Sequence, residues 1–255
     1  MIHDDHTNMS IPYIHCETEH TLVGPQALLP ILFANAKPLS LLDVGCGTGT
    51  WLKAGIEFGI PDVLGVDGVK LPAGQLHVSP EKIKHCDLTQ PWSLEKRFDV
   101  AFCLEVAEHI DKFFAHILID ALVMHSDLIL FSAACPGQPG QHHVNCQWPA
   151  YWQELFNARA YACEDVLRWE IWEDSRIEPW YRQNIFLARR APEIAGHEPR
   201  IKSVVHPAMW NFETGVLWAP LAEHVRQIEQ GTMPVMWGIT LPVKIIMAKL
   251  KRRLQ

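Results

Sequence analysis

The chain has 255 residues, 48% of them hydrophobic, and a formal net charge of -7 at pH 7. This composition suits the core of one large domain, or of one domain with an appendage. The acidic balance argues against a broad nucleic-acid-binding surface, and no apolar run approaches the roughly 18 residues that a bilayer-spanning helix needs. The polar N-terminus shows no signal-peptide pattern, and the seven cysteines form no C-x-x-C pair, so we expect a cytoplasmic protein with reduced thiols.

Short apolar runs alternate with helix-like segments through the first 190 residues. The predicted strands are 40–44, 63–66, 83–86, 99–104 and 128–132, followed by two later strands at 161–171 and 184–190. The predicted helices are 24–36, 50–58, 111–124 and 149–158, with short ones near 80–82 and 93–96. Strands that alternate with helices in this way predict βαβ units and a mostly parallel sheet with helices on both faces.

The composition changes after residue 190, where prolines recur and helices are predicted only at 221–229 and 243–254. We therefore expect a domain over 1–190 and a partly helical extension over 191–255. The end of the chain, LPVKIIMAKLKRRLQ, contains five cations and no acid, and its apolar residues share one helical face. Such a helix either docks on the domain, which we favour, or makes a peripheral contact with an anionic membrane.

A glycine-rich stretch follows the first predicted strand. In LLDVGCGTGTW, residues 41–51, Asp43 precedes Gly45, Gly47 and Gly49 at alternate positions. Glycine at a strand-to-helix turn costs conformational entropy, and its usual purpose is close approach of the backbone to a ligand. A dinucleotide site wants G-x-G-x-x-G, but Thr50 stands where the third small residue belongs, which counts against a nicotinamide-dependent oxidoreductase.

The pattern D-x-G-x-G-x-G resembles the first motif of class I S-adenosylmethionine (SAM)-dependent methyltransferases. Further matches follow in order: LGVDG with Asp67 and Gly68, KHCDLTQPW with Asp87 and Leu88, and FDVAFCLEVAEHI with Glu105. The resemblance covers roughly residues 24–189 and implies a Rossmann-like, seven-stranded sheet whose last strand is antiparallel. It also implies SAM as the cofactor, with Asp67 on the ribose diol and Asp87 on the adenine amino group. The full set of expected cofactor-binding residues is Asp43, Gly45, Cys46, Gly47, Gly49, Asp67, Gly68, Asp87, Leu88 and Glu105.

Three histidines are candidates for the acceptor side of the reaction. His109 follows the fourth predicted strand, and His142 and His143 lie in PGQPGQHHVNCQWPAYW, after the fifth. A histidine near the transferred methyl group is suited to accept a proton from a hydroxyl nucleophile or to orient it. Each also has a structural alternative, as a helix-start residue or as part of a turn.

Two other readings of this region carry less weight. A metal site at His142, His143 and Cys146 lacks a second ligand pair at finger-like spacing, so we expect no metal there. The aromatic residues near 148–152 and 169–181 suit a sugar-binding wall but are more often core.

The sequence therefore predicts a SAM-dependent methyltransferase acting on a small-molecule acceptor, first of all on a hydroxyl oxygen of a sugar or glycan precursor. The alternative is a module of the same fold that binds SAM without turnover or that depends on a partner. An intact glycine loop favours the enzyme.

Overall fold

The computed structural model describes residues 21–209. The chain divides into two compact units, Met1–Met209 and Trp210–Gln255, and the second lies beyond the described part. The helices predicted at 221–229 and 243–254, and with them the basic amphipathic segment, therefore lie outside the described residues.

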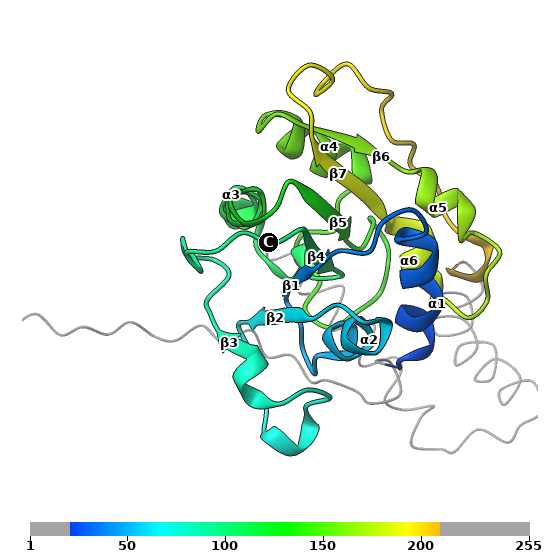
Figure 1. The fold of residues 1–255 in the computed structure, drawn as a ribbon. Coiled ribbons are helices and arrows are strands. Elements are labelled where there is room, and N and C mark those ends of the chain that lie inside the picture. Colours follow the sequence, from blue (N-terminus) through cyan, green and yellow to red (C-terminus); the bar gives the residue numbers. More distant parts are fainter. Residues whose placement is uncertain (1–20, 210–255) are drawn as a thin grey trace, which may run out of the picture. The chain divides into compact units, whose positions relative to one another are not determined.

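The first unit is built on one seven-stranded sheet with the order β3-β2-β1-β4-β5-β7-β6 (Figure 1). Strands β1 to β5 pair in parallel, whereas β7 runs antiparallel to both β5 and β6. The strands are β1 (Ser40–Val44), β2 (Asp62–Asp67), β3 (Ile83–His85), β4 (Val100–Leu104), β5 (Leu128–Ser132), β6 (Tyr161–Glu164) and β7 (Phe186–Arg190). The order reverses between β1 and β4, so the carboxyl ends of these two strands flank the point where open α/β sheets bind ligands.

Helices cover both faces of this sheet and bury two hydrophobic clusters. One cluster packs α3 and α4 against the sheet, and the other packs α1, α2 and α5 against the opposite face (Figure 1). The helices are α1 (Val23–Leu32), α2 (Thr50–Phe58), α3 (Ala115–His125), α4 (Pro149–Asn157), α5 (Val166–Glu170) and α6 (Pro179–Asn184). Single 3₁₀ turns lie at Ala73–Gln75, Pro80–Lys82, Ala107–His109 and Lys112–Phe114.

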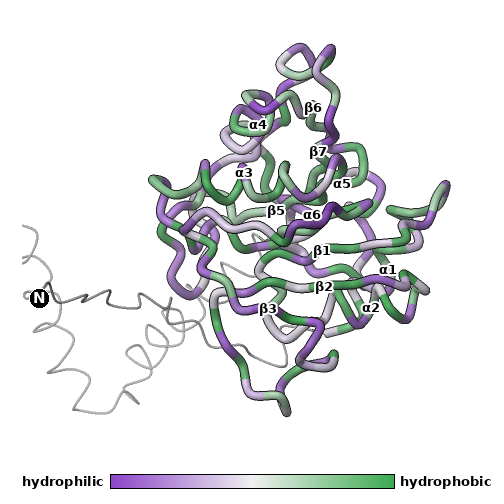
Figure 2. The backbone as a smooth tube through the Cα atoms, turned by 60° about the vertical axis from the view of Figure 1, so that its left-hand side comes forward, coloured by the Kyte–Doolittle hydropathy of each residue, from purple (hydrophilic) through white to green (hydrophobic). Residues whose placement is uncertain are grey.

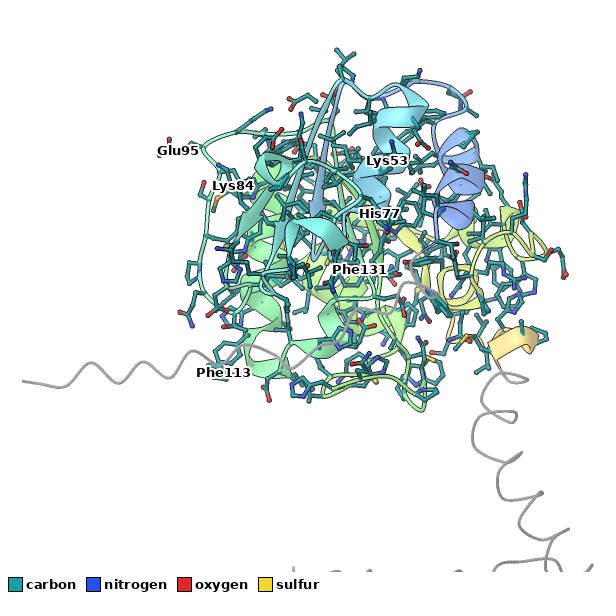
Figure 3. The ribbon with its side chains drawn as sticks, turned by 90° about the horizontal axis from the view of Figure 1, so that it is seen from below. Lys53, His77, Lys84, Glu95, Phe113 and Phe131 are labelled. Atoms are coloured by element: carbon teal, nitrogen blue, oxygen red, sulfur yellow. The ribbon has the colours of Figure 1, made fainter. Side chains whose placement is uncertain are left out.

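Local sequence accounts for these elements. All five residues of β4 are buried, and β5 is buried over four of its five, as expected of parallel strands covered on both faces. Figure 2 shows the hydropathy of each residue along the backbone. Phe131 of β5 lies inside the molecule, whereas Phe113 and Glu95 lie at its periphery (Figure 3).

Helix α4 begins with Pro149, whose missing N–H suits a first helical turn. Helix α2 ends at Gly59 in the left-handed conformation, with φ of 92°.

The sequence prediction of a seven-stranded, mostly parallel sheet is confirmed, with three local corrections. The predicted strand 161–171 is wrong after Glu164, because Val166–Glu170 forms α5. Asn184 ends α6 and does not begin the last strand, and no helix forms at 93–96. Tertiary contacts hold α5 in place, among them the bonds from the buried Arg168 guanidinium to the carbonyls of Gln183 and Lys202. Such long-range contacts outweigh the local alternation of apolar and polar residues, which favoured a strand.

The segment 191–209 packs on the sheet domain. Ile201 joins the cluster beneath α3 and α4, and Glu198 accepts hydrogen bonds from Gln153, Asn157 and the amide of Cys163. The boundary at residue 190 stays a prediction. None of the helices in the described part of the chain is long and apolar enough to cross a bilayer.

Candidate active site

The glycine loop joins β1 to α2 in a backbone conformation that side chains disfavour. Gly45, Gly47 and Gly49 have φ values of 77°, 51° and 80°. The amides of Gly45 and Cys46 donate to the carbonyl of Val66, at 2.8 and 3.2 Å, which ties the loop to the end of β2. The loop therefore turns sharply at the carboxyl edge of the sheet and leads into the N-terminus of α2.

Close packing excludes larger residues from two of the three positions. A Cβ on Gly45 would lie 2.3 Å from a methyl carbon of Val106, and one on Gly49 would lie 2.9 Å from Val78. Val106 follows the carboxyl end of β4, so the glycine loop and the turn after β4 are direct neighbours. The two sequence motifs that suggested cofactor binding thus meet in one place.

Asp67, at the end of β2, binds the glycine loop through its carboxylate. Its Oδ2 accepts a hydrogen bond of 2.7 Å from the amide of Gly47, and its Oδ1 accepts one of 2.7 Å from the amide of Val69. Each carboxylate oxygen has a further lone pair for a ligand. Asp67 therefore fixes the loop, a role that the sequence did not reveal, and lies at the position expected for the ribose contact.

Asp43 presents a buried carboxyl beneath the loop. The residue is 2% exposed, and its Oδ2 has no hydrogen-bond partner. Burial, followed by the charge of Asp67, raises the pKa of Asp43 to about 8. A buried acid that lacks a partner is destabilising when ionised, and a cationic group placed beside it would relieve that cost.

The remaining cofactor candidates divide into packing residues and exposed ones. Cys46 is buried, and a Cβ on Gly65 would lie 2.5 Å from its sulfur, so this thiol fills space beside β2. Leu88 is buried, whereas Asp87 is exposed and its Oδ1 accepts bonds from the amide and hydroxyl of Thr89, at 2.9 and 2.6 Å. Gly68 lies in a bend after β2 with room for a Cβ, 3.6 Å from the carbonyl of Cys86.

Glu105, at the end of β4, joins a buried polar network instead of facing open solvent. It has a positive φ of 55°. Its carboxyl accepts bonds from Gln138, at 2.9 Å, and from Asn184, at 3.2 Å, and its amide donates to Ser132. Burial raises the pKa of Glu105, although the bonds from Asn184, Gln138 and Ser132 oppose that shift. The strained backbone is a reason to look for function here.

Glu108 lies one 3₁₀ turn later and is fully buried. No hydrogen bond of normal geometry satisfies either oxygen of its carboxyl. Burial and then the charge of Glu105 raise its pKa well above the usual range, while the amides of Glu108 and Ala134 lower it. Two acids close together in a buried site favour a shared proton or a bound cation.

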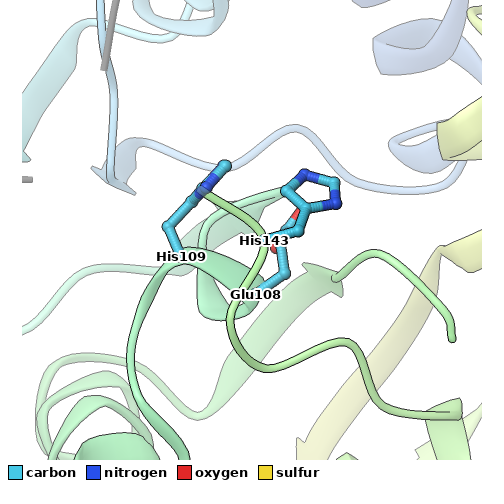
Figure 4. Close-up of side chains that lie close together, drawn as sticks. All are labelled: Glu108, His109 and His143. Carbon is cyan, nitrogen blue, oxygen red and sulfur yellow. The ribbon is translucent and has the colours of Figure 1, made fainter. Parts of the chain in front are cut away.

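His109 and His143 lie side by side at the same edge, with ring centroids 5.1 Å apart (Figure 4). Burial, and then the charge of His143, lowers the pKa of His109 to about 4. Burial also lowers the pKa of His143, against the raising effect of a 3.0 Å bond between its Nδ1 and the carbonyl of Gln138. Both imidazoles are therefore neutral near pH 7.

The loop after β5 carries His143 to this position. The amides of Val144 and Asn145 both donate to the carbonyl of Glu108, at 2.9 and 3.0 Å, so the loop is fastened to the turn after β4. His142 is exposed and has a positive φ of 50°. Among the three predicted histidines, the structure brings His109 and His143 together and leaves His142 outside the pair.

Some residues of this site were not singled out from the sequence. They are Glu108, Gln138 and Asn184, which come from the turn after β4, the loop after β5 and the end of α6. Glu108 carries a usable signal, since a second acid three residues after Glu105 in an apolar run is unusual. Gln138 and Asn184 carry none, because only the tertiary fold places them against Glu105. Of the aromatic candidates, Trp152 is core and Trp169 is exposed.

The sheet order, the helices on both faces and the glycine loop after β1 together define the Rossmann-like fold of class I methyltransferases. Residues 20–128 match the model of a family described as "Methyltransferase domain". The chain carries a class I SAM-dependent methyltransferase domain.

Solved structures with the same fold are distant in sequence. The magnesium protoporphyrin IX methyltransferase of Synechocystis PCC 6803, with bound S-adenosylhomocysteine (SAH), is 18% identical, with a TM-score of 0.50 over 70% of this chain and 89% of that one. The sugar N-methyltransferase of Streptoalloteichus sp ATCC 53650 is 16% identical, with a TM-score of 0.51 over 66% of this chain and 87% of that one. No curated protein sequence matches this chain. These likenesses support the fold and do not identify the acceptor.

Proposed function

We propose that the protein transfers the methyl group of SAM to a hydroxyl oxygen of a small-molecule acceptor, with a sugar or glycan precursor as the first candidate. The observation that carries the proposal is the contact between the glycine loop and the turn after β4. That contact supports a cofactor site near the His109–His143 pair, because Val106 meets the loop at Gly45 and lies three residues before His109.

The cofactor half of the proposal rests on the residues around the glycine loop. The glycines of the loop carry no side chains, so a ligand can lie close along its backbone. Asp67 would bind the ribose, and Asp87 with Leu88 would bind the adenine. The Oδ2 atom of Asp43 is buried without a hydrogen-bond partner and suits a nearby cationic group, and SAM carries both an ammonium and a sulfonium. One of the structures of similar fold contains SAH, the product of methyl transfer from SAM.

The acceptor half rests on the pair of neutral imidazoles. SAM supplies the activated methyl group, so the protein must mainly bind, align and exclude water. A hydroxyl must also lose its proton as the new bond to carbon forms, and His109 and His143 are the neutral nitrogen bases that the described site offers. A sugar as acceptor is consistent with the neighbouring fold of a sugar N-methyltransferase, although that enzyme modifies nitrogen.

Transfer of radiolabel from methyl-labelled SAM tests this proposal. A panel of hydroxylated sugars and small metabolites would be compared with matched analogues in which the hydroxyl is replaced by hydrogen or by an amino group. We expect label in hydroxyl compounds and none in their deoxy analogues. Preferential labelling of the amino analogues would replace oxygen with nitrogen as the acceptor atom. SAM binding without turnover on any compound would favour the partner-dependent module.

A further inference from the structure

A compact set of metal-ligating atoms lies beside the proposed acceptor site. Glu108, His109 and His143 each offer one such atom, and these atoms all lie within 4.8 Å of one another (Figure 4). The set differs from the His142, His143 and Cys146 group weighed in the sequence, because it joins the turn after β4 to the loop after β5. Adjacency in the sequence gave no indication of it.

Glu108 supplies the observation that points to a ligand. Its side chain is fully buried and yet neither carboxyl oxygen has a hydrogen bond of normal geometry. Burying a carboxylate in this way is costly unless a cation or a proton compensates for it. Glu105 adds a second acid close by, and its own oxygens are already bonded to Gln138 and Asn184.

The two histidines are suited to the same role. Each offers a ring nitrogen within 4.8 Å of the other ligand atoms, and the neutral imidazole nitrogen is a common metal ligand. The Nδ1 of His143 is engaged by the carbonyl of Gln138, which leaves Nε2 as the ligand atom and fixes the ring in the manner typical of metal-bound histidines. The loop bonds from Val144 and Asn145 to the carbonyl of Glu108 hold the contributing segments together.

The geometry points to a site for a divalent cation of the Mn²⁺-to-Zn²⁺ series, held by Glu108, His109 and His143 with at least one position open to the acceptor. Two imidazoles and one carboxylate are ligands that these ions favour, and three protein ligands with an open position are typical of catalytic sites. Ligands about 2.1 Å from an ion lie roughly 3.4 Å apart, so the three side chains need only a small adjustment to close on it.

The inference deepens the proposed function and takes its acceptor site from it. A hydroxyl bound to the cation has a lowered pKa and loses its proton to solvent. The resulting oxygen attacks the methyl carbon of SAM, the C–O bond forms, and the C–S bond breaks with its electron pair left on the sulfur of SAH. His109 and His143 then act as ligands that position the acceptor, and neither has to take up the proton.

Titration of the full-length, EDTA-treated and desalted protein with Co²⁺, followed by visible absorption and by competition with Zn²⁺, tests the site directly. We expect one Co²⁺ per chain with a d–d spectrum of a nitrogen- and oxygen-ligated ion. His143→Ala and Glu108→Gln should each weaken Co²⁺ binding by at least about 10–100-fold, the loss seen even for residues that only support ligands.

His142→Ala is the matched control, because the imidazole of His142 is exposed and outside the set. The Co²⁺ affinity of this variant should equal that of the wild type. Circular dichroism and SAM calorimetry establish that each variant is folded; should Glu108→Gln fail to fold, His143→Ala carries the comparison.

Equal Co²⁺ binding by the wild type and the folded His143→Ala variant would overturn the inference, as would an equal loss in His142→Ala. Its failure is distinguishable from failure of the proposed function. Co²⁺ binding at this site without any methyl transfer would support the metal site and count against the function. Undiminished methyl transfer by protein kept in EDTA would support the function and contradict the catalytic role of the ion.

Discussion

Gly140 lies directly against the imidazole of His143, and a Cβ on Gly140 would come within 2.1 Å of His143 Nε2. The atom in the way is the far end of a side chain, so Gly140→Ala is expected to move the ring and leave the fold intact. A displacement of about 1 Å at a reacting site costs on the order of 10²-fold in rate. We therefore expect kcat to fall by about that factor with the Kd for SAM unchanged, as measured by steady-state kinetics and calorimetry.

Gly74→Ala is the control for this substitution, since a Cβ there has no neighbour within 4 Å. It should leave both parameters unaltered. Wild-type kcat in Gly140→Ala would mean that the position of the His143 ring is unimportant for transfer.

Alanine substitutions of His109 and His143 should lower kcat more than the same substitution of the exposed His142. His143→Ala is expected to lower kcat by about 10²–10⁴, the range for losing the group that takes up the acceptor proton or that helps to hold the ion that lowers the pKa of the acceptor hydroxyl, while SAM affinity stays nearly constant. His109→Ala should act similarly, because the two rings are in contact. His142→Ala should have the smallest effect of the three. Full activity in both the His109 and His143 variants would leave alignment of the substrates alone to account for catalysis.

Asp43 is expected to make SAM binding depend on pH. Its pKa of about 8 lies above the unfolded value of 3.8, so between these limits the folded apo protein holds a proton that the unfolded chain has released. The contribution of Asp43 to stability therefore falls as pH rises from about 4 to about 8. If cationic SAM lowers this pKa, binding near pH 7 should release protons. Calorimetry in buffers of different ionisation enthalpy measures this release.

Asp43→Asn is the matching variant. It should unfold at a higher temperature than the wild type at pH 8, because it removes a buried acid, and it should bind SAM more weakly by about 1–3 kcal/mol with no proton release. An unchanged proton count in the variant would place the titrating group elsewhere.

Asp87 is expected to bind the adenine amino group. Asp87→Ala should weaken SAM binding by about 1–3 kcal/mol, the cost of losing a hydrogen-bond partner in a binding site. Thr89→Val keeps the carboxylate and removes only the hydroxyl that donates to it, so its affinity should stay close to that of the wild type. Calorimetry measures the SAM affinity of both variants. An unaltered affinity in folded Asp87→Ala would exclude Asp87 from the cofactor site.

Sequence reasoning succeeded where local pattern and buried strands coincide. The runs SLLDV and LILFS are short and mostly apolar, and both form strands at the predicted residues. It failed at α5, where RWEIWED alternates in part like a strand but tertiary bonds from Arg168 fix a helix. The glycine loop could be predicted because its positive φ values require glycine, which leaves a recognisable pattern in the sequence. The Glu108–His109–His143 set was not, because the path of the loop after β5 depends on bonds to the distant carbonyl of Glu108.

Calorimetric titration of the wild type with SAM, SAH and NAD tests the central claim most directly, with Gly47→Val as the comparison. The account predicts one SAM or SAH per chain, no NAD, and no SAM in the variant, because a branched side chain at a position with φ of 51° would disrupt the loop and block the approach of the ligand. Binding of NAD and not of SAM, by a protein with this glycine loop intact, would contradict it.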